Sequence, residues 1–203
     1  MKTMLKEAAM LLLITVVSGL VLGFVYEITK EPIAAAQEAA AKAAYQEVFP
    51  QAADFEAIEV MPPSGDSIWL EKGYEGVDIE ETLRAVDSTG NVLGYVITVT
   101  SHEGYGGDIT FSMGIQRDGT LNGISILSIS ETAGLGMKAE AVLKPQFAGK
   151  NVTEFTYTKT GAVTENQIDA ISGATITTNA VTTAVNGGLY YFQTQLGGGA
   201  DEP

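Results

Sequence analysis

The chain lacks cysteine and has a single histidine, His102, among its 203 residues. The absence of cysteine excludes disulfide bridges, thiolate-ligated zinc, ordinary iron–sulfur clusters and a cysteine nucleophile. One imidazole is also too few for any metal site that needs two, so no metal ligands are assigned. If the protein takes part in redox chemistry, an organic cofactor must therefore supply it.

Positive charge is scarce as well. Eleven Lys and Arg residues stand against 25 Asp and Glu, which gives a formal net charge of −14. No run of basic residues interrupts this excess of negative charge. Because a polyanion would be repelled by such a surface, the composition argues against binding to nucleic acid.

A long uncharged stretch, AAMLLLITVVSGLVLGFVY, occupies residues 8–26. At about 1.5 Å per residue, a helix of this length nearly crosses a hydrocarbon core of roughly 30 Å. A cleaved signal peptide is the alternative, but the stretch exceeds the usual apolar core of roughly 7–15 residues. The pattern therefore favours an uncleaved transmembrane helix. Lys2 and Lys6 precede it, so the positive-inside rule places the N-terminus in the cytoplasm and the remaining chain outside.

Three segments follow from this placement. Residues 1–28 hold the cytoplasmic N-terminus and the transmembrane helix. Residues 29–60 form a connecting helix, because residues 33–48 consist of strong helix formers that end before Pro50. The sequence PPSGD at 62–66 marks a loop. Residues 61–203 then make one extracytoplasmic domain of ordinary size.

The middle of the chain has the pattern of two β-hairpins. Residues 82–87 and 92–100 predict strands joined by the turn STGN, and residues 108–116 and 121–130 predict strands joined by RDGT. The hairpins resemble each other at an offset of 29 residues, which aligns Gly90 with Gly119. Two units are too few for a solenoid. The expected fold class is therefore α+β, with an antiparallel sheet and flanking helices.

Each predicted hairpin leads into a glycine-rich loop. The first is Gly104-Tyr105-Gly106-Gly107, and the second is ETAGLGMK at residues 131–138. Glycine lets backbone N–H groups approach a ligand closely, so the second loop could line a cofactor pocket. It matches neither a Walker A loop nor G-x-G-x-x-G. The spacing alone fits a structural turn and a cofactor loop equally.

The segment DAISGATITT, residues 169–178, opens the last helical pattern of the chain. Residues 180–196 predict a C-terminal helix with a weak spot at Gly187-Gly188. Ser172 or Thr175 could be the N-cap of this helix, which needs no further function. A phosphate held by a hydroxyl there would also face the positive end of the helix dipole. The pattern leaves both readings open.

The same segment resembles the D-x-x-S/T-G-A-T signature at which flavin transferases attach FMN, through a phosphoester, to the final threonine. All fixed positions of the signature are filled, and Thr175 is the matching acceptor. The whole chain resembles the G subunits of Rnf complexes, membrane ferredoxin:NAD oxidoreductases that pump Na⁺ or H⁺. It is also similar to the C subunit of the related Na⁺-translocating NADH:quinone reductase, which is generally longer. Ile129 and Ala133 depart from the family, where many relatives have His and Pro.

The resemblance implies an electron-transfer subunit that carries one covalent FMN and catalyses nothing alone, so no catalytic residue is assigned. Other membrane subunits of the Rnf complex are its implied partners, and a flavin transferase is needed for its maturation. The alternatives are the quinone-reductase protein and a membrane-tethered, non-redox binding or scaffolding module. Besides Thr175, the implied FMN contacts are Ser172, Gly173, Ala174, Glu131, Thr132, Leu135, Gly136, Met137, Lys138 and Tyr105.

Three further features have simpler interpretations. Trp69 is expected in the core, and His102 is expected to be an exposed polar residue. Asp78, Glu80 and Glu81 could bind Ca²⁺, but a solvated acidic face is the simpler interpretation of such a cluster.

Overall fold

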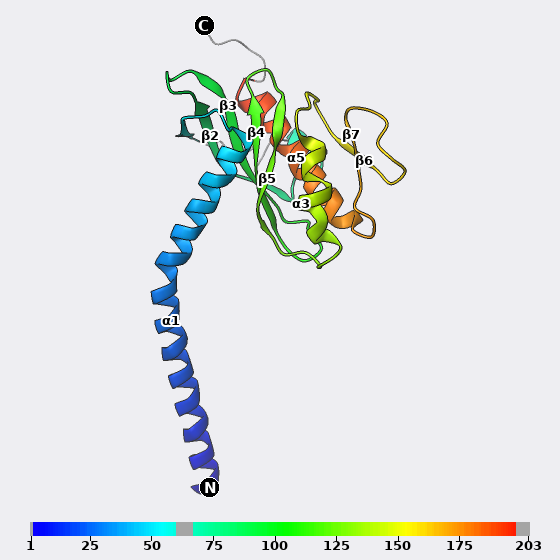
Figure 1. The fold of residues 1–203 in the computed structure, drawn as a ribbon. Coiled ribbons are helices and arrows are strands. Elements are labelled where there is room, and N and C mark those ends of the chain that lie inside the picture. Colours follow the sequence, from blue (N-terminus) through cyan, green and yellow to red (C-terminus); the bar gives the residue numbers. More distant parts are fainter. Residues whose placement is uncertain (1, 60–66, 198–203) are drawn as a thin grey trace. The chain divides into compact units, whose positions relative to one another are not determined.

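The computed structural model describes residues 2–59 and 67–197, and the loop predicted at residues 62–66 lies outside these ranges. The chain divides into two compact units, Met1–Ala40 and Ala41–Pro203. Figure 1 shows the course of the chain in each of them. The second unit contains the sheet, and all the predicted site residues belong to it.

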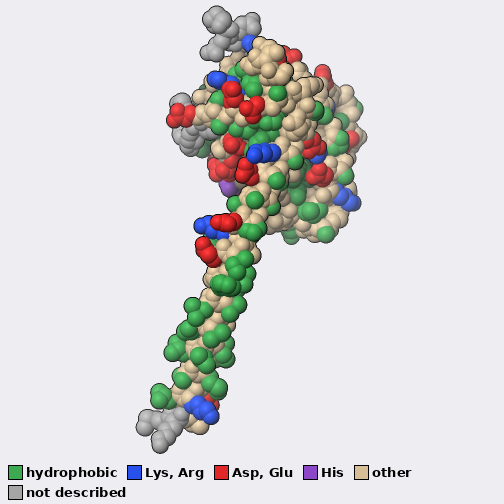
Figure 2. Space-filling model, turned by 60° about the vertical axis from the view of Figure 1, so that its left-hand side comes forward, with side chains coloured by type: hydrophobic (Ala, Val, Ile, Leu, Met, Phe, Trp, Pro, Cys, Tyr) green, Lys and Arg blue, Asp and Glu red, His purple; other side chains and the backbone are tan. Residues whose placement is uncertain are grey.

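Helix α1 runs without a break over Lys2–Val48, with Pro32 inside it. The two helices predicted at 8–26 and 33–48 are therefore one. Within the described residues, α1 is the helix long and apolar enough to cross a membrane. Figure 2 shows hydrophobic side chains around much of its length, and those from Met4 to Ile33 are exposed. The connecting helix predicted over 29–60 ends at Val48, and residues further on form a strand instead.

The second unit is built on one antiparallel sheet with the strand order β1-β2-β3-β4-β5. The predicted hairpins are confirmed as β2–β3 and β4–β5, and together with the helices they confirm the α+β fold class. Strand β1, which pairs along β2, was not predicted. The strands are β1 (Asp54–Ile58), β2 (Val77–Val86), β3 (Val92–Ser101), β4 (Ile109–Gln116) and β5 (Leu121–Ile129).

The turns of the two hairpins show why their sequences repeat. Gly90 and Gly119 both have a φ of 87°, a left-handed conformation that suits glycine. In the first turn, the Asp87 carboxylate accepts hydrogen bonds from the backbone N–H groups of Thr89 and Asn91. Bonds from the side chains and then the backbone of these two residues hold the pKa of Asp87 below its usual range. The turn is thus stabilised by its own side chains.

Helix α5 (Thr175–Gln195) covers one face of the sheet and packs against β2, β3 and β4 (Figure 1). The predicted weak spot is a place of close approach, because a Cβ on Gly188 would lie 2.2 Å from the sulfur of Met113. Trp69, in the short helix α2 (Ser67–Glu71), is 3% exposed, which confirms its place in the core. On the other face, Tyr45 and Val48 in the last turn of α1 and the following Phe49 form a hydrophobic cluster with strand residues. The strand residues are Leu83, Ala85 and Val96.

The rest of the second unit lies between β5 and α5 in sequence. A 3₁₀ turn and two single-turn helices follow β5, and a small parallel pair of strands precedes α5. These elements are η1 (Gly136–Lys138), α3 (Ala139–Val142), α4 (Lys144–Phe147), β6 (Thr156–Thr158) and β7 (Gln167–Asp169).

Candidate functional site

A cavity of about 490 Å³ lies where the two glycine-rich loops meet the start of α5. Its volume falls within the range of roughly 300–1,000 Å³ typical of small-molecule sites. Most of the predicted cofactor contacts come together here, from segments far apart in the sequence. The lining residues are Tyr105, Glu131, Thr132, Leu135, Gly136, Gly173, Ala174, Thr175, Ile176 and Thr177.

Three predicted contacts do not line this cavity. Ser172 is exposed at the turn before α5, and Met137 and Lys138 are exposed in η1. Conversely, the sequence reasoning missed Ile176 and Thr177 as lining residues. They follow Thr175 directly, so a helix beginning at Thr175, rather than near residue 180, would have indicated them.

The start of α5 is not capped in the way the sequence suggested. The N-cap residue is Ala174, and no side-chain hydrogen bond caps it within the described part of the chain. Neither Ser172 nor Thr175 is therefore the N-cap. The first amide N–H groups of an α-helix have no partner inside the helix. The first turn of α5 thus presents backbone donors and the positive end of the helix dipole beside the cavity.

Gly173 allows the chain to turn sharply into α5. Its φ of 78° is a backbone conformation that residues other than glycine rarely adopt. A Cβ at this position would also lie 3.1 Å from the side chain of Leu135, in the other loop. The glycine of the signature therefore brings the start of α5 against the loop that follows β5.

The three threonines near the start of α5 differ in their surroundings. Thr178 is fully buried, donates to the carbonyl of Ala174 at 2.9 Å and accepts from the N–H of Ile171 at 3.1 Å. Thr177 is 1% exposed. Thr175 is half-buried at the cavity, and no hydrogen bond from another described residue engages its hydroxyl. Of the three, Thr175 is the residue that is not buried.

Glu131 joins the two glycine-rich loops beneath the cavity. Its side chain is 9% exposed, and its Oε1 accepts from the N–H of Tyr105 at 2.7 Å and of Gly106 at 3.4 Å. A Cβ on Gly136 would lie 2.7 Å from Oε2 of Glu131 and 2.6 Å from the hydroxyl oxygen of Thr177. The carboxylate thus fills space that only glycine leaves open, and it holds Tyr105 at the cavity rim.

We expect Glu131→Ala to lower the free energy of unfolding by about 1.5–3 kcal/mol, because the amides of the first loop lose a charged acceptor. Glu131→Gln is the matched control, since its amide oxygen can still accept, and it should cost less than about 1 kcal/mol. The measurement is denaturation of the full chain in detergent, followed by the fluorescence of Trp69, the one tryptophan. Equal losses of unfolding free energy in both variants would show that hydrogen bonds to the Glu131 side chain do not stabilise the first loop.

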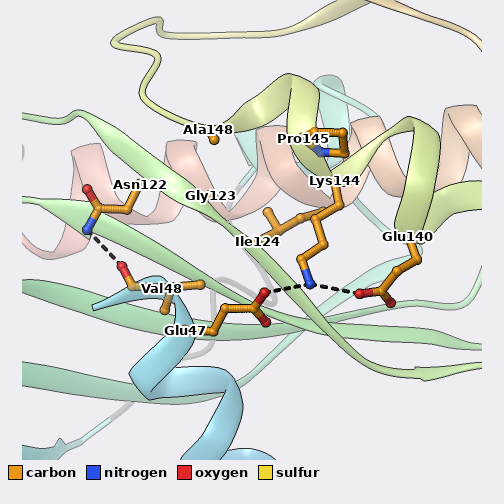
Figure 3. A pocket seen from close by; sticks show the side chains of 9 residues that line it. All are labelled: Glu47, Val48, Asn122, Gly123, Ile124, Glu140, Lys144, Pro145 and Ala148. Carbon is orange, nitrogen blue, oxygen red and sulfur yellow. Dashed lines mark hydrogen bonds and ion pairs between the residues drawn. The ribbon is translucent and has the colours of Figure 1, made fainter. Parts of the chain in front are cut away.

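A second cavity, of about 350 Å³, lies between the last turn of α1, β5 and the helices α3 and α4 (Figure 3). Lys144 stands between two carboxylates, with its Nζ 2.8 Å from Glu47 and 2.7 Å from Glu140. The bond from Lys144, followed by that from Ser125, holds the pKa of Glu47 below its usual value. Burial would lower the pKa of Lys144, but the two carboxylates raise it.

The polar groups of this second cavity bind one another. In addition to the ion pairs, Asn122 donates to the carbonyl of Val48, the last residue of α1, at 2.8 Å (Figure 3). Such mutual bonding leaves little for a ligand to satisfy. This cavity is therefore interpreted as the joint that fixes the end of α1 to the sheet.

The acidic residues of β2 alternate with buried ones rather than converge. Asp78 and Glu80 are exposed, whereas Val77 and Ile79 are buried. Within the described residues, no group of three or more His, Asp and Glu side chains is arranged to hold a metal ion. His102 is exposed as expected, but it also contacts two aspartates, which the sequence did not indicate.

Comparison with known proteins agrees with this description. Residues 104–190 match the model of the FMN-binding domain family, and residues 1–48 match the model of the RnfG N-terminal region. The fold and these matches define a class of protein that combines a candidate transmembrane helix with an FMN-binding-type domain. The chain belongs to the family of the G subunits of ion-translocating Rnf oxidoreductase complexes.

Two relatives establish this membership. The first is the G subunit of the Na⁺-translocating ferredoxin:NAD⁺ oxidoreductase complex of Acetobacterium woodii, 34% identical over 95% of this chain and 93% of that protein. The second is the G subunit of the ion-translocating oxidoreductase complex of Methanosarcina acetivorans, 33% identical over 97% and 98%. Among solved structures, NqrC of Shewanella oneidensis is 21% identical and covers 58% of each chain, with a TM-score of 0.46.

Proposed function

We propose that this chain is the FMN-carrying electron-transfer subunit of an Rnf-type complex, and that its FMN is attached covalently through a phosphoester to Thr175. The observation that carries the proposal is the position of Thr175, which is half-buried, is the first residue of α5 and lines the cavity. Family membership supports the same function, because related subunits are named as parts of ion-translocating oxidoreductases.

The residues of the cavity fit the proposed group. The phosphate would lie at the positive end of α5, where backbone N–H groups lack partners inside the helix. The side chains of Leu135 and Ile176, 41% and 52% exposed, offer apolar surface for a flat ring at the rim. Tyr105, 70% exposed, offers an aromatic ring beside them. Ser172, Met137 and Lys138 would contact only parts of the cofactor that extend beyond the cavity.

Bound FMN supplies the exchange of one or two electrons, which a chain without cysteine cannot supply through thiolate-held metals. The protein's own part is to hold and orient the group. Thr175 retains it against loss to the surroundings, Gly173 and Leu135 bring the loops together, and Glu131 fixes Tyr105 at the rim. The protein then passes electrons between redox centres of neighbouring Rnf subunits and catalyses nothing alone.

The proposal is tested on protein purified from its native membrane. A denaturing gel should show flavin fluorescence that migrates with the chain, and intact-mass measurement should show one added FMN. An unmodified mass, from cells in which a flavin transferase is active on another substrate, would overturn the proposal that FMN is covalently attached. That result would favour the membrane-tethered, non-redox module.

We also propose that the second unit lies on the extracytoplasmic side of the cell membrane, because the Lys residues that precede the apolar stretch favour a cytoplasmic N-terminus. Protease added to intact cells, after removal of the wall, should digest the residues beyond α1. The same treatment should spare a cytoplasmic marker protein. Complete protection of these residues would contradict the orientation, and with it the extracytoplasmic electron relay.

A further inference from the structure

The loop Glu103–Gly107 connects β3 to β4 and carries Tyr105, and side chains tie its two ends together. His102 and Asp108 flank the loop, one step beyond the last β3–β4 pair, Ser101 with Ile109. Nδ1 of His102 lies 2.9 Å from Oδ1 of Asp108. A loop this rich in glycine loses much conformational entropy when it is ordered. The contact between His102 and Asp108, which flank the loop and are here called its neck, therefore contributes to holding the loop in one conformation.

A second contact braces the neck against the neighbouring strand. Nε2 of His102 lies 3.0 Å from Oδ2 of Asp78 on β2, and the His102 backbone N–H donates to the carbonyl of Gly76 at 2.9 Å. The imidazole thus reaches from β2 to the start of β4, across the end of β3. Among the described residues, Asp78 and Asp108 are the charged groups that face the ring.

The two contacts together engage both ring nitrogens of His102. Both nitrogens face carboxylate oxygens, which only accept hydrogen bonds. An imidazolium has two N–H donors, whereas a neutral imidazole has one donor and one lone pair. The neutral ring would therefore leave one aspartate facing a lone pair. The number of bonds that close the neck depends on the protonation of His102.

From this geometry we propose that His102 is a positioning residue, whose protonated imidazole holds the Tyr105 loop in place and whose deprotonation loosens it. The tip of the loop would then be held by Glu131, through the N–H groups of Tyr105 and Gly106, without the full support of the neck. The proposal rests on the proposed function in one respect, which is that Tyr105 stands at the rim of a flavin cavity.

The direction of the pH dependence follows from the aspartates. Hydrogen bonds from His102 to Asp78 and then Asp108 raise the pKa of the imidazole above its ordinary value of about 6.5, against the smaller effect of burial. A group with a raised pKa in the folded state stabilises it fully below its unfolded pKa. That stabilisation is lost as the pH rises through the folded pKa. The loop should therefore loosen on the alkaline side.

Because the chain has one histidine, its imidazole can be titrated without assignment by NMR of the full chain in detergent. We expect a pKa above the ordinary value in the wild type, lowered by Asp78→Asn and by Asp108→Asn. An unshifted imidazole in the wild type would overturn the proposal.

The loop itself is followed by amide hydrogen exchange, corrected for the intrinsic effect of pH. The protein is the full chain with Thr175→Ala, so that the result does not depend on flavin. We expect residues 103–107 to lose protection about fivefold as the pH rises through the His102 pKa, as for the loss of one hydrogen bond. His102→Gln should abolish this pH dependence, and the turn at residues 117–120 should not respond. An equal response in His102→Gln would overturn the proposal.

The flavin fluorescence of the flavin-loaded wild type tests the role of His102 separately from the proposed flavin attachment. We expect its flavin fluorescence to change over the same pH interval, and that of His102→Gln to stay constant. If exchange responds but the flavin signal does not, the positioning role is overturned and the flavin attachment stands. If the wild type carries no flavin, the proposed function fails, while the exchange measurement still decides whether His102 controls the loop.

Discussion

Thr175→Ala is expected to give a folded, colourless protein whose intact mass is lower than that of the wild type by one FMN. The substitution removes the hydroxyl oxygen that would form the phosphoester. It should cost little stability, because Thr175 is half-buried, is not the N-cap of α5, and is replaced by the best helix former. Coexpression with a flavin transferase, followed by intact-mass measurement, checks the prediction.

Thr177→Ala is the matched control within the same helix turn. Two residues further on, its side chain points roughly 200° around the helix axis from that of Thr175. Thr177 also lines the cavity, but it is 1% exposed, whereas Thr175 is half-buried. We expect this variant to keep one FMN. Retention of covalent flavin by Thr175→Ala would instead place the acceptor at another residue.

Thr175→Ser adds a test of the chemistry. Serine keeps the hydroxyl at the first residue of α5 and removes only the methyl group, so we expect some covalent flavin to remain. Absence of flavin from wild type and all three variants, despite an active transferase, would favour the non-redox module. Thr178 needs no variant of its own, because its hydroxyl already bonds to Ala174 and Ile171.

The hairpins could be predicted because their signals are local. Each turn sequence carries a glycine with the same φ, and a strand lies directly before and after it. The beginning of β2 was missed for a physical reason. A register shift between Ile79 and Glu81 changes which side chains face inward, so the alternation from Val77 onward does not continue in phase to residue 82. Strand β1 is a short edge strand with an irregular burial pattern.

In the candidate site, too, short sequence motifs could be predicted, whereas contacts between segments distant in the sequence could not. The signature that ends at Thr175 indicated a flavin acceptor by resemblance, and the glycine loops indicated close backbone approach. The contact between Gly136, Glu131 and Thr177 joins the second glycine-rich loop to helix α5, and no sequence spacing encodes it. His102 likewise gained its partners through the pairing of β2, β3 and β4. Contacts of this kind become visible only when strand register is known.

The second large effect is expected at Asn186, a polar residue that the sequence placed within an apolar helical pattern. Asn186 lies on the buried side of α5 and is 7% exposed. Its Nδ2 donates to the carbonyl of Phe155 at 2.9 Å, and its Oδ1 accepts from the N–H of Phe155 at 2.7 Å. Phe155 is 1% exposed and packs edge-on against Phe147, with 5.0 Å between the ring centroids. One side chain thus satisfies both backbone groups of a core residue.

Asn186→Ala should lower the free energy of unfolding by about 2–4 kcal/mol, because two buried backbone groups lose their partners at roughly 1–3 kcal/mol each. Asn179→Ala is the matched control, since Asn179 is exposed on the same helix and its replacement should cost less than about 0.5 kcal/mol. Denaturation in detergent is followed by the fluorescence of buried Trp69, which packs against Tyr190 of α5 with 6.1 Å between the ring centroids. If both variants unfold at the same denaturant concentration, Asn186 does not hold the segment before β6 against the helix.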